Sequence, residues 1–155
     1  MDPLQEHQDQ ALRQYQIAEH LLNSTLLLIK DSRLLIGIIH NLNSSLEHAL
    51  DAILIHEIPK FNSSDKSTLN YKLDLFRSRV INKHDLTEKY LPFIIKIREL
   101  VTLHKKSPVE FKRGDKHVFC GEEYELKILS AADVALFLKQ TKQFLEVMEK
   151  ILAPI

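Results

Sequence analysis

Apolar residues recur every three to four positions along most of this chain, which is the spacing of one face of an α-helix. The pattern predicts a helix over 4–29 and a second helix over 33–58. The face of the first helix consists of Leu12, Tyr15, Ala18, Leu22, Thr25, Leu26 and Ile29. The face of the second consists of Leu35, Ile38, Ile39, Leu42, Leu46, Ala49, Leu50 and Ile53. The break at Lys30-Asp31-Ser32 is so short that we expect an antiparallel helical hairpin, with Ser32 as N-cap.

Capping and proline signals predict two helices in the middle of the chain. Residues 60–68 form a polar loop, and the apolar spacing resumes over 69–81. The run Asp85-Leu86-Thr87-Glu88 has the form of a capping box, and Pro92 suits the first turn of a helix that starts near Tyr90. The apolar face of that helix consists of Phe93, Ile94, Ile97, Leu100, Val101 and His104.

The pattern changes after Ser107-Pro108, which ends that helix. Residues 109–129 are rich in β-forming side chains and hold two glycine turns, so we expect a β-hairpin or an extended excursion. Ser130 and Asp133 form a second capping box, which predicts a last helix to about Leu152. The predicted fold is all-α: one domain over 1–155, a four- or five-helix up-down bundle with a short β-hairpin or extended insertion before the last helix.

Composition supports this reading and adds an expected location. Three Gly and five Pro in 155 residues leave room for few turns, which favours long helices over many strands. The single cysteine, Cys120, rules out an internal disulfide and indicates a reducing compartment. The first residues are polar and acidic, unlike a signal peptide, and the longest apolar run, 34–39, is far shorter than a membrane span. We therefore expect a cytoplasmic protein that does not enter a membrane.

A formal net charge of zero hides an uneven distribution. Residues 1–59 carry 3 basic and 8 acidic side chains, residues 60–117 carry 14 and 7, and residues 118–155 carry 4 and 6. Two interpretations remain open for the basic middle. It can complement the acidic segments when the helices pack, or it can form a surface that binds the phosphates of RNA or a nucleotide.

No metal or cofactor motif is present, so we predict neither. The eight histidines do not occur at di-iron or zinc-protease spacing, and the chain has no glycine-rich phosphate loop. His40, Glu47 and Asp51 share the polar side of the second helix, which we interpret as a solvated face. For Cys120 two readings stay open: a small core residue, or a thiolate assisted by His117.

His104 is the histidine with the strongest claim to a chemical role. It occupies an apolar-face position at the end of a helix and is followed by Lys105 and Lys106. In one interpretation the imidazole is buried and structural. In the other it lies in a cleft or at a dimer interface, where a neutral imidazole serves as general base near pH 7.

The helical hairpin and an Arg followed at short spacing by a His resemble HEPN domains. The match is Arg98 and His104, which have five residues between them. Pairs of similar spacing are Arg13/His20, Arg33/His40, Arg77/His84 and Arg79/His84. The chain also looks like small archaeal helical-bundle proteins, a likeness in the runs I-K-D-S-R-L-L and H-K-K-S-P-V-E-F that implies a fold and no activity.

The HEPN resemblance implies a homodimer that binds RNA or a nucleotide and acts as a metal-independent ribonuclease. In this reading His104 takes the proton of a ribose 2′-OH and Arg98 stabilises the phosphorane. The nucleic-acid backbone would be held by Lys105, Lys106, Lys112, Arg113 and Lys116. Wide apolar helix faces also favour a homodimer. The alternative is a non-catalytic protein–protein interaction module, a homodimeric adaptor or antitoxin-like partner that docks a protein through the insertion at 109–129 or through the last helix.

Overall fold

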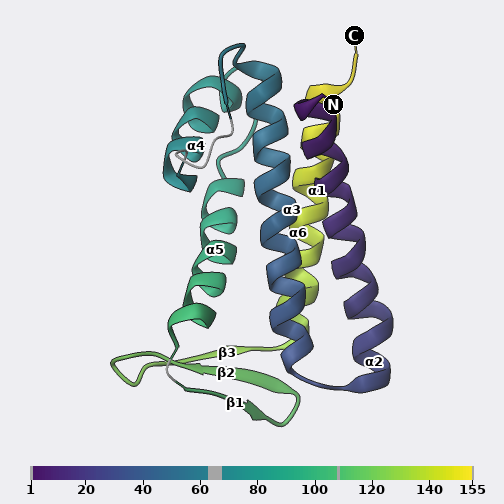
Figure 1. The fold of residues 1–155 in the computed structure, drawn as a ribbon. Helices are drawn as coiled ribbons and strands as arrows, with labels where there is room; N and C mark the ends of the chain where they lie inside the picture. Colours follow the sequence, from purple (N-terminus) through teal and green to yellow (C-terminus); the bar gives the residue numbers. More distant parts are fainter. Residues whose placement is uncertain (1, 63–67, 108, 155) are drawn as a thin grey trace.

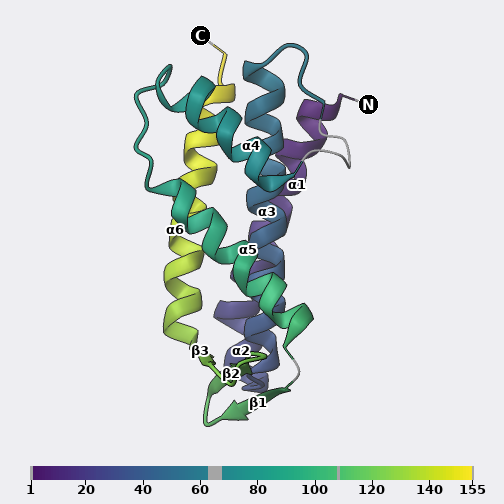
Figure 2. The same ribbon diagram turned by 90° about the vertical axis from the view of Figure 1, so that its left-hand side faces the viewer.

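The computed structural model describes residues 2–62, 68–107 and 109–154. Its helical segments are α1 (Pro3–His20), the π-helical η1 (Leu21–Thr25), α2 (Leu26–Ile29), α3 (Arg33–Glu57), α4 (Leu69–Leu75), the π-helical η2 (Phe76–Ile81), α5 (Tyr90–Lys106) and α6 (Ala131–Leu152). Its strands are β1 (Val109–Arg113), β2 (Lys116–Cys120) and β3 (Leu126–Leu129). The helices form an elongated bundle with the sheet across one end and both chain termini at the other (Figures 1 and 2).

Helix α3 is the centre of the bundle. Helices α1 and α6 pack along it on one side and α5 crosses it on the other (Figure 1). Between positions 34 and 55 none of its residues is exposed, and most of its apolar side chains are fully buried. The neighbouring helices therefore cover the polar side of α3 as well as its apolar face.

Small residues let α1 approach α3 closely. Ala11 and Ala18 of α1 are fully buried against the core. The hydroxyl of Ser45, also fully buried, donates a hydrogen bond to the backbone carbonyl of Ala11 over 2.6 Å. This bond satisfies a polar group that would be costly to bury alone, and it fixes the register of the two helices.

The three strands form an antiparallel sheet in the order β1-β2-β3. Gly114 has a φ of 63° in the tight β1–β2 turn, a conformation that glycine adopts without steric cost. Because strand residues alternate between faces, Phe119 and Leu129 point toward the helices and are buried. The sheet closes the end of the bundle with these two side chains and has no core of its own.

Most of the predicted elements are confirmed. The helix predicted over 4–29 is α1, η1 and α2 in succession, and the one predicted over 69–81 is α4 followed by η2. The helix predicted to start near Tyr90 is α5, which begins at Tyr90 with Pro92 in its first turn. The capping box of Ser130 and Asp133 is present, with both of its hydrogen bonds. The insertion before α6 is a sheet of three strands, so β3 is added to the predicted hairpin.

One local prediction is wrong, one is correct only in position, and one is tested only in part. The run 85–88 is irregular and caps no helix, because Asp85 takes a positive φ and the helix starts later, after Lys89. Ser32 stands at the N-cap position of α3 but makes no capping bond, while the carboxylate of Asp31 accepts the backbone N–H of Arg33. Part of the polar loop predicted over 60–68 lies outside the described residues.

The side of α3 that we interpreted as solvated is covered by other helices. Asp51 is buried and pairs with Lys72 of α4, with 2.7 Å between the Lys72 Nζ and a carboxylate oxygen. Glu47 pairs with Arg98 of α5. The sequence spacing alone could not show that α4 and α5 return to lie on this side.

In the part of the chain that the structure describes, no helix is both long and apolar enough to cross a membrane.

Replacement of a fully buried leucine of α3 tests its central position. Leu42 has no exposed surface, so we expect Leu42→Ala to lower the free energy of unfolding by about 2–5 kcal/mol through lost burial and a residual cavity. Leu28→Ala is the matched control: that side chain is 85% exposed, and its loss should change stability by no more than about 0.5 kcal/mol. Chemical denaturation of both variants is the measurement, and equal losses would contradict the fold.

Candidate functional site

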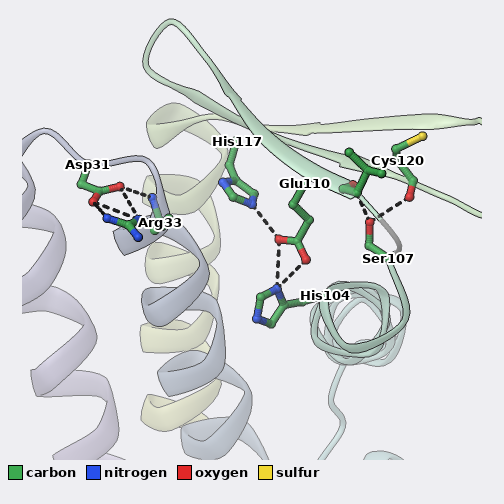
Figure 3. Close-up of polar contacts among 8 residues, drawn as sticks. Asp31, Arg33, His104, Ser107, Glu110, His117 and Cys120 are labelled. Carbon is green, nitrogen blue, oxygen red and sulfur yellow. Dashed lines mark hydrogen bonds and ion pairs between the residues drawn. The ribbon is translucent and has the colours of Figure 1, made fainter.

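The candidate site lies where the end of α5 meets the inner face of the sheet. His104 comes from the last turn of α5, Glu110 from β1 and His117 from β2. The inner face follows from the register, in which Lys112 lies opposite His117 and Glu110 opposite Phe119. Figure 3 shows the side chains of Glu110 and His117 pointing from the strands toward the helices, where the His104 imidazole meets them.

The carboxylate of Glu110 bridges the two imidazoles. Its oxygens lie 2.9 and 3.0 Å from Nδ1 of His104, and one of them lies 2.7 Å from Nε2 of His117 (Figure 3). His117 is only 5% exposed, whereas 39% of the His104 side chain is exposed. The network therefore joins a buried imidazole to one that solvent or a ligand can reach.

The hydrogen-bond roles follow from the chemistry of Glu110. An ionised carboxylate only accepts, so Nδ1 of His104 and Nε2 of His117 both donate to it. A neutral His104 then presents the lone pair of Nε2, as a general base requires. Nδ1 of His117 is buried and has no hydrogen-bond partner among the described residues, and an unpaired lone pair there is less costly than an unpaired N–H.

A further imidazole, that of His40, approaches His104 from α3. The two rings meet edge to face with centroids 5.4 Å apart. Burial lowers the pKa of His40, and the nearby His104 and Lys105 lower it further. His40 is half-buried, and no hydrogen bond to its ring nitrogens is present in the described part of the chain.

Ser107 ties this end of α5 to the sheet. Its hydroxyl lies 2.8 Å from the backbone carbonyl oxygens of both Val109 and Cys120, and it can donate its one proton to either (Figure 3). The strand residues on both sides of the hairpin are thereby anchored to the helix that carries His104. Such a tie holds Glu110 in reach of the imidazole.

Arg98 lies farther along the same seam between α3 and α5. Its guanidinium pairs with the carboxylate of Glu47. Six positions separate it from His104, which corresponds to about 9 Å along the helix. Within the described residues, no hydrogen bond or ion pair joins Arg98 to His104. The structure therefore does not bring the two predicted catalytic residues together within one chain.

The five predicted phosphate-binding residues separate into three places. Lys105 and Lys106 end α5, and Lys105 is close enough to His40 to affect its pKa. Lys112 lies on the inner sheet face beside His117. Arg113 and Lys116 lie opposite each other at the β1–β2 turn, on the outer face. Lys105, Lys106 and Lys112 therefore lie on the same side of the sheet as His104. Arg113 and Lys116 lie on the opposite side.

Two hollows adjoin this end of the bundle. One, of about 540 Å³, lies between the α2–α3 turn and β1, and it is lined by Lys30, Arg33, Lys112, Glu110 and His117 among others. The other, of about 730 Å³, contains Arg98 and Lys106 but also Glu99, Glu122, Glu123 and Glu125. The first is the more suitable for an anion because its lining has more cations than carboxylates, although the second is larger.

Arg33 at the edge of the first hollow is held by Asp31. Its side-chain nitrogens lie 2.7 to 3.2 Å from the carboxylate oxygens (Figure 3). These hydrogen bonds from the side chain and backbone of Arg33 lower the pKa of Asp31 to about 2. The Arg33 side chain is exposed while that of Asp31 is half-buried, so Asp31 fixes the position of a guanidinium that solvent can reach.

The reactive-thiol reading of Cys120 is wrong in its geometry. Cys120 and His117 are three positions apart on β2, so their side chains point to opposite faces of the sheet. The thiol is half-buried and lies 3.7 Å from the backbone carbonyl of Gly121. In the described residues no group of three or more His, Cys, Asp or Glu side chains is arranged to hold a metal ion.

Comparisons of the chain with protein-family models, with curated proteins and with solved structures found no match.

Sequence reasoning found His104 but missed the residues that orient it. Glu110 was assigned no role, and His117 was considered only beside Cys120. The available signal was the spacing of Glu110 and His117 in a hairpin with a two-residue turn at Gly114-Asp115. That turn length fixes the register and places both side chains on one face.

The pairing of Arg98 with Glu47 predicts energetic coupling between them. In a double-mutant cycle, Arg98→Gln and Glu47→Gln should be coupled by about 0.5–1 kcal/mol in the free energy of unfolding, because each side chain is partly shielded from solvent. Glu99 is the exposed neighbour of Arg98, so Glu47→Gln with Glu99→Gln is the control and should be additive. Additivity in both cycles would contradict the pairing.

The environment of His40 predicts its titration. We expect its pKa, measured by NMR from the ring proton shift, to lie below 6.5 and to rise in His104→Gln, because one nearby positive charge is then absent. The unfolded chain binds this proton more tightly than the folded chain does. The stability that His40 contributes is therefore complete above about pH 6.5 and is lost as the pH falls below it.

His84→Gln is the matched control for that measurement. His84 also lies beside a carboxylate, Glu57, with 2.5 Å between Nε2 and an oxygen, but neither is among the groups that affect His40. A His40 pKa that is unchanged in His104→Gln, or changed equally in His84→Gln, would contradict the contact.

Proposed function

We propose that this protein binds RNA and cleaves it without a metal ion, with His104 and His40 as the acid–base pair. The observation that carries the proposal is the orientation of His104 by Glu110, with a second imidazole edge-on beside it. A base held by a third group is the usual arrangement of catalytic histidines. The partial exposure of the His104 side chain gives substrate access to it.

The reaction needs no co-reactant. His104 takes the proton of a ribose 2′-OH, the 2′-oxygen attacks the adjacent phosphorus, and the P–O5′ bond breaks. A protonated His40 gives its proton to the leaving 5′-oxygen. The products are a 2′,3′-cyclic phosphate and a 5′-hydroxyl, and the two imidazoles exchange protonation states. General acid–base catalysis of this kind contributes a factor of about 10² to 10⁴ per group.

Cations near the two histidines suit a phosphate backbone. Lys105 and Lys106 follow His104 on α5, and Lys112 lies on the same sheet face as Glu110. The hollow beside them adds Lys30 and Arg33. In this proposal Lys105 neutralises the charge that develops on phosphorus, and Arg98 positions α5 through Glu47.

The test is cleavage of a short single-stranded RNA by the purified protein and by His104→Gln. We expect the variant to be slower by about 10² to 10⁴. Wild-type products should carry a 2′,3′-cyclic phosphate by mass spectrometry, and the DNA of the same sequence should stay intact because it lacks the 2′-OH. His84→Gln should cleave at the wild-type rate. Equal rates for His104→Gln and wild type, or no cleavage by wild type, would overturn the catalytic proposal.

Binding is measured separately on the same RNA. The double variant Lys105→Gln/Lys106→Gln should bind more weakly and with a smaller dependence on salt, because fewer counterions are released. Lys139→Gln/Lys142→Gln is the control, since both residues are exposed on α6. Tight binding by His104→Gln without cleavage would assign catalysis to His104. An RNA affinity that does not change with salt concentration would overturn the proposal that the lysines bind the phosphate backbone.

A further inference from the structure

The outer face of the sheet, which points away from the helices, is apolar. The register places Phe111, Val118 and Ile128 side by side on it, with Val109 and Leu126 at its edges. Four of these side chains, Val109, Phe111, Leu126 and Ile128, are between 43% and 55% exposed. No described helix covers this face, because the helices all lie on the other side of the sheet (Figures 1 and 2). Val118, in the middle, is fully buried, so the exposed apolar surface consists of the other four side chains around it. Exposed apolar side chains grouped in this way are a candidate interaction site.

The two ends of this face carry opposite charge. Arg113 and Lys116 are directly opposite each other at the β1–β2 turn, on the outer face. Like charges so placed destabilise a hairpin, and neither residue has an ion pair within the described part of the chain. Glu122 and Glu123 are exposed in the β2–β3 loop. Figure 1 shows this loop and the β1–β2 turn at opposite ends of the sheet.

The separation of the ends makes them act independently. A five-residue strand such as β2 spans about 17 Å. The Debye length at physiological salt is about 8 Å, so each end presents its own sign of charge to a partner. The face is therefore basic at one end, apolar in the middle and acidic at the other end.

We propose that this face binds the same face of a second copy of the chain. The two-fold axis lies in the interface and runs perpendicular to the strands, so that the second sheet is reversed end for end. Each Arg113–Lys116 end then meets the Glu122–Glu123 end of the other copy, and the apolar centres pack on each other. An isologous interface has to be complementary to itself, and this reversal satisfies the requirement at both ends.

The charge pattern selects this occupant over others. An anionic membrane surface or a nucleic acid would attract Arg113 and Lys116 but repel Glu122 and Glu123. A uniformly basic partner would have the reverse problem. A second copy satisfies both ends at once. The helical faces, which the sequence suggested as the dimer surface, are occupied by packing around α3.

The size of the face indicates a weak dimer. Three strands about 4.8 Å apart and about 17 Å long have a footprint of roughly 250 Å². A standard interface buries about 800 Å² per partner, so we expect dissociation constants in the micromolar range or weaker. In this arrangement each His104 lies on the inner side of its sheet, away from the interface. The dimer proposal therefore does not depend on the proposed ribonuclease activity.

The test is sedimentation of the full chain from about 1 µM to about 1 mM, with paired charge reversals. Arg113→Glu/Lys116→Glu has two acidic ends, and Glu122→Lys/Glu123→Lys has two basic ends. Each alone should dimerise at least about 10-fold more weakly than wild type. Mixed in equal amounts, they should form a heterodimer with an affinity within about 3-fold of wild type. Lys139→Glu/Lys142→Glu on α6 is the control and should dimerise like wild type.

A second pair of variants tests the apolar centre. Ile128→Lys should abolish the dimer, whereas Leu136→Lys should not, although Leu136 on α6 is the more exposed of the two, at 54% against 45%. Thermal melting by circular dichroism checks that each variant is folded. A wild-type protein that stays monomeric at about 1 mM, charge reversals that dimerise normally, or a mixture that stays monomeric would each overturn the proposal.

Discussion

The burial of α3 on all sides is the constraint on which the rest of this structure depends. Its apolar residues drive the other helices onto it, but the helix also carries polar side chains, and burying them unpaired would be costly. Three of them have partners from three different neighbours: Ser45 bonds to α1, Asp51 pairs with Lys72 of α4, and Glu47 pairs with Arg98 of α5. His48 meets His7 of α1 with 2.9 Å between their Nδ1 atoms. These polar contacts specify which helix lies on which side.

Among those contacts, the one between His40 and His104 differs in kind. The contacts of Glu47 and Asp51 join opposite charges, and this attraction offsets part of the free-energy cost of removing the charges from water. Two imidazoles edge to face do not compensate each other, and the pKa of His40 is lowered by its burial and further by the nearby His104 and Lys105. A stabilising role would be better served by a carboxylate at position 40. The acid–base reaction proposed above would use both histidines, one of them oriented by Glu110.

The sequence predicted the helices well because their signals are local. The apolar spacing around Leu42 and the capping box at Ser130 each depend on residues within a few positions. The site required information of longer range. His40 and His104 are brought together only by the return of α5 across α3, and no periodicity on either helix encodes that crossing. The same limit explains why the side of α3 with Asp51 was expected to face solvent, since nothing near Asp51 in the sequence indicates Lys72.

The sheet connects the site to the surface through the alternation of its side chains. Placing Glu110 and His117 on the inner face forces Phe111 and Val118 outward, because neighbouring residues of a strand point to opposite faces. Alternation determines the direction of those side chains but not their polarity. A solvent-facing position on a small antiparallel sheet accepts Thr, Lys or Glu at little expense to folding. Apolar residues at Phe111 and Ile128 expose surface that water disfavours, and the proposed dimer would bury that surface.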